Sequence, residues 1–257
     1  MNHQQAGQSR AGRCRWRLAL GLLGDLLLTA GLVVALFVGY SLWWTDLLAN
    51  RQVGQDAGRL RQSWTASAAP GGPAAPPASA APTAPAGEAA PAYQAGDGIG
   101  FLHVPAMGRD YQVLIKLGTS PEVLNEGVAG VYQEPYAAAM PWDPSGNFAL
   151  AAHRDGHGAK FHDLDAVGKG DAVVVETRDR WYVYRVDAVL DQTTKEDVGV
   201  VAPVPEKAGY TQPGHYITLT TCTPVYTSRY RMAVWGSLVR VDQVDARRTP
   251  PPELRAG

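Results

Sequence analysis

The residues best suited to chemistry lie in segment 217–231, which reads ITLTTCTPVYTSRYR. Cys222 stands at the end of a run that alternates apolar residues with threonines, a pattern typical of a β-strand. Pro224 has no N–H to donate to a strand ladder, so we expect the cysteine at a strand end, facing a loop. A second strand is expected to open at Tyr230 and to carry Arg231 among apolar residues. The thiol and the guanidinium are therefore predicted to lie near the ends of adjacent strands.

A histidine is predicted at the end of a third strand. Segment 147–163 reads NFALAAHRDGHGAKFHD, in which a short apolar strand leads directly into His153 and then into a loop rich in glycine and histidine. A thiol, an imidazole and a guanidinium at strand ends are the parts of a nucleophile, a proton carrier and an oxyanion stabiliser. The alternative is an inert Cys222, because free cysteine most often behaves as a small buried hydrophobe.

These segments resemble the sortase family. Residues 218–222 read TLTTC and match the family's TLxTC motif, with a histidine upstream and an arginine downstream. The segments AAHRDGHGAKF and TLTTCTPVYTSRYRM are most similar to the class E branch, the housekeeping type of actinobacteria, where AGHR and TLTTC are usual. One departure is Ala152, where the family commonly has glycine. The resemblance covers about residues 98–242 and implies a mainly β fold, an eight-stranded closed β-barrel with short helices.

The resemblance also implies an activity. Sortases are cysteine transpeptidases, so Cys222 would cleave a C-terminal sorting signal of the LAxTG or LPxTG type between Thr and Gly and hold the product as a thioester. His153 would carry the protons, and Arg231 would stabilise the oxyanion. Surface proteins that bear the signal are the expected substrates, and an amine of a peptidoglycan precursor of the lipid II type is the expected acceptor.

Neighbouring residues compete for these roles. His157 and His162 lie in the same loop as His153, and Arg229 lies two residues from Arg231, on the same face of a regular strand. His153 is preferred because it ends the strand and matches the family's histidine. Arg231 is preferred because it matches the family's arginine, directly before an apolar residue.

Two further residues are predicted to bind substrate. Thr221 matches the family's threonine before the cysteine, where its hydroxyl would help to position substrate; the alternative is a simple β-forming residue on the strand. Tyr132 is expected to shape the pocket that, in class E relatives, prefers LAxTG over LPxTG signals. Tyr136, or a core role for Tyr132, fits this position nearly as well.

The elements before the predicted domain differ sharply in composition. Residues 1–17 carry four arginines and no acidic residue, and residues 18–44 are almost wholly apolar apart from Asp25. At 1.5 Å per residue, the apolar segment is long enough to cross about 30 Å of hydrocarbon. By the positive-inside rule we predict a cytoplasmic tail and a single transmembrane signal anchor in the cell membrane, with the following domain extracytoplasmic. A cleaved signal peptide is the alternative, but bulky Trp43 and Trp44 follow here instead of a small-residue cleavage site.

Residues 45–96 are predicted to form an extracytoplasmic juxtamembrane segment and linker. Residues 46–64 are polar with scattered leucines and are expected to form a helix just outside the bilayer. Residues 65–91 are nearly all Ala, Pro, Gly and Ser, which predicts a disordered tether without a core. At roughly 3 Å per residue, such a tether would place the domain tens of ångströms from the membrane, within a cell wall.

The catalytic barrel is predicted at residues 97–242, followed by a C-terminal tail at 243–257. Short strand-like segments separated by turns, with little helix, favour a closed antiparallel barrel. The individual elements are strands at 99–104, 111–115, 148–152, 172–177 and 181–186, a helical turn at 120–124, and weak strand character at 188–190 within a long connection, 187–213.

Composition argues against several classes of function. The formal net charge is -1 and the basic residues beyond the N-terminal tail are dispersed, so no nucleic-acid partner is expected. The three loop histidines lack a convincing metal-ligand spacing, so no metal or cofactor is expected. Cys14 and Cys222 lie on opposite sides of the predicted span and cannot form a disulfide. The alternative functions are an endopeptidase without transfer and a non-catalytic, wall-associated scaffold.

Overall fold

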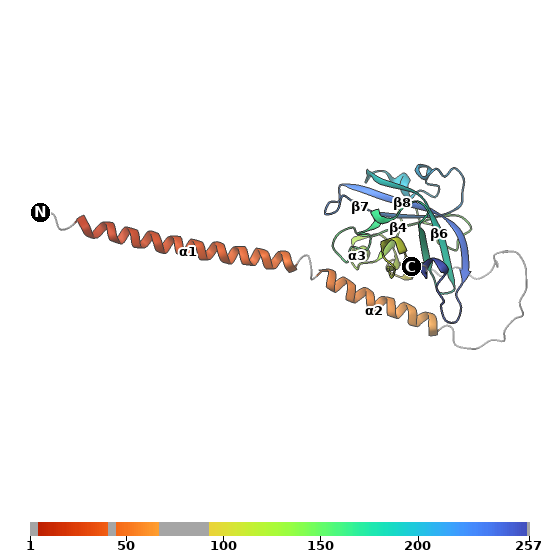
Figure 1. The fold of residues 1–257 in the computed structure, drawn as a ribbon, viewed down its shortest axis with the longest axis horizontal. Helices are drawn as coiled ribbons and strands as arrows, with labels where there is room; N and C mark the ends of the chain where they lie inside the picture. The colour runs from red at the N-terminus through yellow and green to blue at the C-terminus, as the bar shows by residue number, and fades with distance from the viewer. Residues whose placement is uncertain (1–4, 41–44, 67–92, 256–257) are drawn as a thin grey trace, which may run out of the picture. The chain divides into compact units, whose positions relative to one another are not determined.

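The computed structural model describes residues 5–40, 45–66 and 93–255 (Figure 1). The chain forms two compact units, Met1–Thr45 and Asp46–Gly257. The first contains helix α1 (Gln5–Gly39), whose part Gly21–Gly39 is long and apolar enough to cross a membrane. Large apolar side chains are exposed all round this part, as a lipid-facing helix requires. The predicted end of the span, at residues 41–44, lies outside the described residues.

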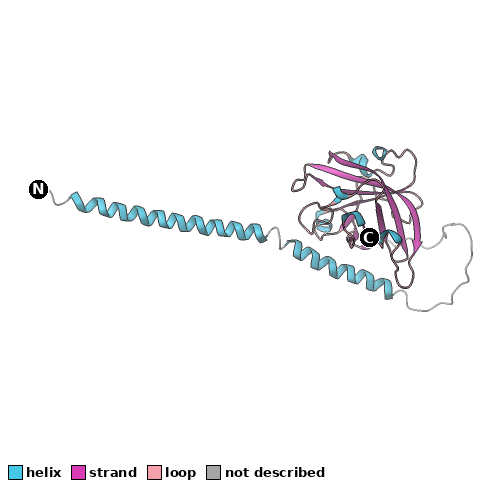
Figure 2. Cartoon of the chain, in the orientation of Figure 1, coloured by secondary structure: helices cyan, strands magenta, loops and turns pink. Residues whose placement is uncertain are grey.

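The second unit contains a closed barrel of eight strands in the order β1-β2-β3-β4-β7-β8-β6-β5, which confirms the predicted fold class. Figure 2 shows the strands gathered in this barrel, with only short helices between them. The strands are β1 (Gly98–His103), β2 (Gln112–Leu117), β3 (Ala129–Val131), β4 (Gly146–Ala151), β5 (Ala172–Glu176), β6 (Arg180–Thr194), β7 (His215–Thr223) and β8 (Tyr230–Gln243). The short helices are η2 (Pro105–Met107), α3 (Pro121–Leu124), η3 (Leu164–Ala166), η4 (Val198–Val201), η5 (Glu206–Ala208) and η6 (Pro252–Leu254).

The barrel is not wholly antiparallel, which corrects the pairing expected from the sequence. The pairs β2–β3 and β4–β7 are parallel. Parallel neighbours cannot be joined by a hairpin and need a crossover connection. The chain between β2 and β3 passes through α3, and the chain between β4 and β7 passes through β5 and β6. Because β4 and β7 run in the same direction, the residues that follow them emerge at the same end of the barrel.

Side-chain alternation along the strands separates an interior core from an outer cluster. Ile217 and Leu219 of β7 belong to the large interior cluster that fills the barrel. Ala149 of β4 and Trp235 of β8 belong instead to a cluster on the outer face, together with Val200 of η4. The indole Nε1 of Trp235 donates to the Val200 carbonyl at 2.8 Å. The chain between β6 and β7 is thereby fixed against the outer face of β8.

Two strands differ from the sequence-based expectation. Strand β6 continues through residues 188–194, where the sequence predicts a mostly irregular connection. Its pairing with β8 contains register shifts, and polar residues interrupt its alternation, which explains the weak sequence signal. Strand β3 was not predicted, because three residues are too few to show a period.

Residues Thr45–Ala66 form helix α2, as the sequence predicts for this segment. Four of its side chains, Val53, Ala57, Leu60 and Trp64, form a cluster with the outer face of β1 and β2. The compact unit therefore begins at Asp46 and includes this helix as well as the predicted barrel. The predicted tether, residues 65–91, lies almost entirely outside the described residues.

The C-terminal tail also belongs to this unit. Leu254 of η6 and Val244 pack against the buried Trp181 of β6. Arg240 of β8 forms an ion pair with Glu253 at 2.7 Å. The tail is therefore attached to the β5–β6 side of the barrel by both apolar and charged contacts.

Candidate active site

Strands β4, β7 and β8 bring the three predicted catalytic residues into one row. Cys222 and Arg231 are direct cross-strand partners in the antiparallel pair β7–β8. In the parallel pair β4–β7, Ala151 is the partner of Thr220, and continuing this register by two residues sets His153 level with Cys222. The contact does continue beyond β4, because the Ala152 N–H donates to the Thr220 carbonyl at 3.3 Å.

All three side chains belong to the outer face of the barrel. Alternation on β7 puts Leu219 inside and Cys222 outside, and on β8 it puts Met232 inside and Arg231 outside. Leu150 and Ala152 are interior residues, so His153 follows on the outer side. Cys222 is half-buried, unlike the fully buried Ile217 and Leu219 of the same strand. The thiol is therefore not one of the side chains that fill the barrel.

His153 is held by a residue that the sequence did not suggest. Its Nε2 lies 2.9 Å from Oδ1 of Asn125, the residue that ends α3. Because the amide oxygen only accepts, this contact places the proton on Nε2 and leaves Nδ1 as the basic nitrogen. Burial lowers the pKa of His153, and the nearby His157 lowers it further, whereas Asp155 raises it. The imidazole is therefore neutral near pH 7.

The loop after His153 is fixed by polar contacts. The carbonyl of His153 accepts from the Phe161 N–H at 3.0 Å, and Nδ1 of His162 lies 2.9 Å from the Arg154 carbonyl. The ring of His157 lies 5.2 Å from that of His153, centroid to centroid. His162 thus supports the loop, whereas His157 lies beside the ring of the catalytic candidate.

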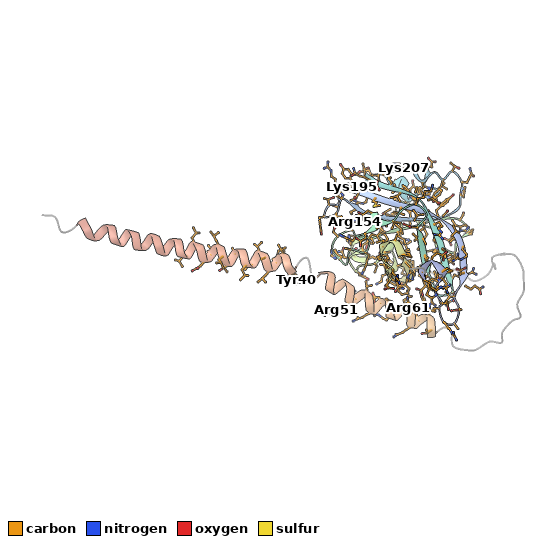
Figure 3. All side chains as sticks on the ribbon, in the orientation of Figure 1. Tyr40, Arg51, Arg61, Arg154, Lys195 and Lys207 are labelled. Atoms are coloured by element: carbon orange, nitrogen blue, oxygen red, sulfur yellow. The ribbon has the colours of Figure 1, made fainter. Side chains whose placement is uncertain are left out.

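Arg154, labelled in Figure 3, and Asp155 connect this loop to β8 and to the chain between β7 and β8. The side chain of Arg154 is 4% exposed, and its guanidinium lies 2.9 Å from Asp165 Oδ2 and 3.6 Å from Met232 Sδ. Asp155 Oδ2 accepts from the Tyr226 N–H at 2.6 Å. Sequence reasoning missed both roles; the only signal was the pair of charged residues directly after the strand-end histidine.

Arg231 is positioned by the backbone at the start of β8. Its Nη1 donates to the carbonyls of Ser228 and Tyr230, each at 3.0 Å. The competing Arg229 precedes the strand, and its guanidinium lies 5.1 Å from the centre of the Tyr230 ring. Arg231, and not Arg229, is therefore the cross-strand neighbour of Cys222.

The two predicted substrate residues have different surroundings. The Tyr132 hydroxyl lies 2.9 Å from Thr220 Oγ1, and its ring packs on the outer cluster. Burial raises the pKa of Tyr132. Thr221 is buried, and its Oγ1 donates to the Ala152 carbonyl at 2.8 Å. This geometry gives Thr221 a supporting role for the backbone that leads to His153.

The described residues contain no group of three or more His, Cys, Asp or Glu side chains arranged to hold a metal ion. What the row of β4, β7 and β8 offers is a thiol, a neutral imidazole and a fixed guanidinium on one face. Together they can provide a nucleophile, a proton acceptor and a positive charge for an oxyanion.

The sequence is similar to a known protein family and to two known relatives. Residues 102–239 match the sortase domain. The chain is 49% identical to sortase SrtE2 of Streptomyces coelicolor over 99% of this chain and 97% of that protein, and 39% identical to sortase SrtE1 of the same organism over 84% and 56%.

Solved structures agree with the sequence relatives. The crystal structure of sortase E1 from Streptomyces coelicolor, with a tripeptide in its active site, superposes with a TM-score of 0.58 at 42% identity, covering 62% of this chain and 97% of that one. Sortase E from Streptomyces avermitilis gives a TM-score of 0.57 at 34% identity, covering 63% of this chain and 100% of that one. The barrel, the sequence relatives and the structural neighbours agree that this chain belongs to the sortase family of cysteine transpeptidases, in its class E branch.

Proposed function

We propose that this sortase cleaves LAxTG- or LPxTG-type sorting signals between Thr and Gly, and transfers the released protein to an amine of a lipid II-type peptidoglycan precursor. Cys222 is the nucleophile, His153 the proton carrier and Arg231 the oxyanion stabiliser. The observation that supports this most is the alignment of these three residues on one outer face, across three neighbouring strands.

The first half of the reaction forms the thioester. Nδ1 of His153 takes the thiol proton, and the Cys222 sulfur attacks the threonine carbonyl carbon of the signal. The oxyanion that forms is stabilised by Arg231, the cross-strand partner of Cys222, whose Nη1 is held by the carbonyls of Ser228 and Tyr230. When the intermediate collapses, the Thr–Gly bond breaks, and His153 returns the proton to the leaving glycine amine.

The second half transfers the acyl group. The acceptor amine attacks the thioester carbonyl, and His153 removes a proton from the attacking nitrogen. The C–S bond then breaks, which releases the new amide, and the proton on His153 returns to the thiolate, which restores the thiol and the neutral imidazole. A neutral imidazole in the resting enzyme suits this order of steps, because His153 must first accept a proton. The burial of His153 and the nearby His157 both favour its neutral form.

Tyr132 and Thr221 complete the proposed site in different ways. Tyr132 lies beside Thr220 on the outer face, where its ring and hydroxyl would contact the residue that precedes x-Thr-Gly in the signal. A Tyr132→Leu variant is therefore expected to change the preference between LAxTG and LPxTG peptides. Thr221 is buried and supports the backbone that leads to His153, through its hydrogen bond to the Ala152 carbonyl.

The apolar part of α1 is proposed to anchor the enzyme in the cell membrane as a single span. The arginines among residues 1–17 favour a cytoplasmic N-terminus, which makes the catalytic unit extracytoplasmic. Surface proteins and a membrane-bound acceptor would then meet the enzyme on the outer side of the membrane.

The test is incubation of the protein with LAxTG and LPxTG peptides, with and without an added amine, followed by mass spectrometry. A threonyl thioester on Cys222 and an amide product are expected, and Cys222→Ala should give neither. Acid product alone, even with excess amine, would identify an endopeptidase. The absence of any thioester, with thiol alkylation no faster than that of a model thiol, would contradict the enzymatic proposal.

A further inference from the structure

Helix α2 forms an interface with the barrel that the catalytic site does not use. We propose that α2 is a docked attachment helix, which holds the catalytic barrel to the membrane-anchored end of the chain by non-covalent contacts. The attachment would then not depend on the covalent connection through residues 67–92. This inference rests on the membrane anchoring proposed above and concerns how the anchored helix and the barrel stay together.

The apolar side of α2 fits the outer face of β1 and β2. Trp64 is 8% exposed, and its ring meets that of Phe101 edge to face, with the centroids 5.5 Å apart. Leu60 lies so close to β1 that a Cβ on Gly98 would come within 3.2 Å of it. Without α2, the buried rings and methyl groups of Phe101 and Leu114 would face water.

A buried lysine also depends on α2. Lys116 of β2 is 7% exposed, although it lies on the outer face. Its Nζ pairs with Asp56 Oδ2 of α2 at 2.6 Å and also contacts Glu126. A buried ammonium group requires charged partners, and α2 supplies one of the two.

A buried carboxylate joins α2 to the barrel a second time. Glu176 of β5 is 1% exposed and lies 3.1 Å from Arg61 of α2, labelled in Figure 3. The same carboxylate pairs with His103 of β1 at 3.0 Å and with Arg248 of the C-terminal tail at 2.9 Å. The guanidinium of Arg248 also lies 4.5 Å from the Trp64 ring centre. Helix, barrel and tail therefore meet at one buried charge.

Helix α2 lies between the apolar helix α1 and residues 67–92 in the chain, so its interface with the barrel attaches the barrel to the end of the chain that carries α1. Val53, which packs in the interface, follows Gly39 at the end of the apolar helix by 14 residues. The chain thus reaches the barrel through α2 before it enters residues 67–92. A cut in that segment would leave two fragments joined only by the interface between α2 and the barrel.

The experiment is to insert a protease recognition sequence within residues 67–92 of the full chain, reconstitute the protein in lipid vesicles, cleave it and sediment the vesicles. We expect the barrel fragment to stay with the vesicles after complete cleavage, as judged on a gel. Release of this fragment into the supernatant would overturn the proposal. The uncleaved protein is the control for anchoring: its failure to sediment would count against the membrane proposal and not against the interface.

A pair of variants identifies the interface. Leu60→Asp puts a carboxylate against the apolar face of β1 and should raise the fraction of released fragment at least about tenfold. Gln62→Asp adds the same charge at an exposed position of α2 and should leave retention unchanged. Retention of the Leu60→Asp fragment would show that another surface holds it, which also overturns the proposal. Peptide turnover by the released fragment verifies that the barrel is folded.

Discussion

Two outer faces of the same barrel, one on β1 and β2 and the other on β4, β7 and β8, differ in how they treat apolar surface and charge. On β1 and β2, a helix covers the apolar surface, and the buried charges of Lys116 and Glu176 are neutralised by carboxylates and guanidinium groups. On β4, β7 and β8, the thiol of Cys222 is half-buried, and His153 sits where burial favours its neutral form. Paired charges stabilise the covered face, whereas the other face carries the thiol and the imidazole that are proposed for catalysis. Substitutions on the two faces should therefore affect different quantities.

Removing the thiol should have the largest effect. Cys222→Ala is expected to lower kcat/KM by at least about 10³-fold, because no other group can form the thioester. The free energy of unfolding should change by about 1 kcal/mol or less, since the residue is only half-buried. Peptide-cleavage kinetics and chemical denaturation measure the two quantities. A variant that retained turnover would place the nucleophile elsewhere.

Arg231→Ala should reduce kcat by about 10² to 10³-fold through loss of oxyanion stabilisation. Arg229→Ala is the matched control, because its guanidinium lies over the Tyr230 ring and is not the cross-strand neighbour of Cys222. Its kcat should fall less than about threefold. Equal losses in the two variants, measured with the same peptide, would remove the distinction drawn between the two arginines.

On the covered face, Glu176→Gln should cost stability and spare catalysis. The change removes the buried negative charge that pairs with His103 and Arg248, for an expected loss of about 3 kcal/mol in the free energy of unfolding. Asp179→Asn is the control: its carboxylate is 67% exposed and pairs with Arg178, so the loss should stay below about 0.5 kcal/mol. Urea denaturation measures both, and kcat of the folded Glu176→Gln protein should match that of the unaltered enzyme.

Asn125→Ala should lower kcat by about tenfold with little change in KM, because the imidazole of His153 loses the group that fixes its orientation and tautomer. Asn125→Gln, which carries the same amide on a longer side chain, should recover part of this loss. A purely structural role would instead lower the unfolding free energy and leave kcat of the folded fraction intact. Kinetics and denaturation of both variants separate these outcomes.

The smallest effect concerns the pKa of His153. His157→Asn removes the neighbouring imidazole, whose interaction with His153 lowers the pKa of His153, and asparagine tolerates the positive φ of 49° at this position. The pKa of His153 should therefore rise, and an NMR titration of its ring protons follows this directly. Since the lowered pKa means that the folded state resists protonation, stability should fall as the pH drops below about 6.5, and less so in the variant. An unchanged or lower pKa in the variant would contradict this account.

The sequence was informative where a period or a motif marked the residue. The strand pattern predicted Cys222 and His153 at strand ends; Cys222 lies next to the last residue of β7, and His153 follows two residues after the end of β4. Asn125 carried no such mark, because it ends a helix of one turn and lies 28 residues before His153. Asn125 lies in the connection between the parallel strands β2 and β3, and this pairing could not be predicted because β3 has only three residues.

The docking of α2 was missed for a different reason. Its polar composition suggested an isolated helix, yet Val53, Ala57, Leu60 and Trp64 recur at spacings of four, three and four residues. That spacing is the apolar stripe of a helix that packs on another surface. The ion pairs that Lys116 and Glu176 form with α2 could not be predicted, since Asp56 and Arg61 lie more than 50 residues away from them in sequence.

A docked α2 limits the space that the enzyme can search. Only residues 40–44 separate α1 from α2, and five residues extend at most about 18 Å, whereas the 26 residues from 67 to 92 would extend to about 90 Å. Under the membrane anchoring proposed above, an enzyme held by α2 would work close to the lipid surface, so newly exported proteins and lipid-linked building blocks would be within its range, and mature polymer farther out would not.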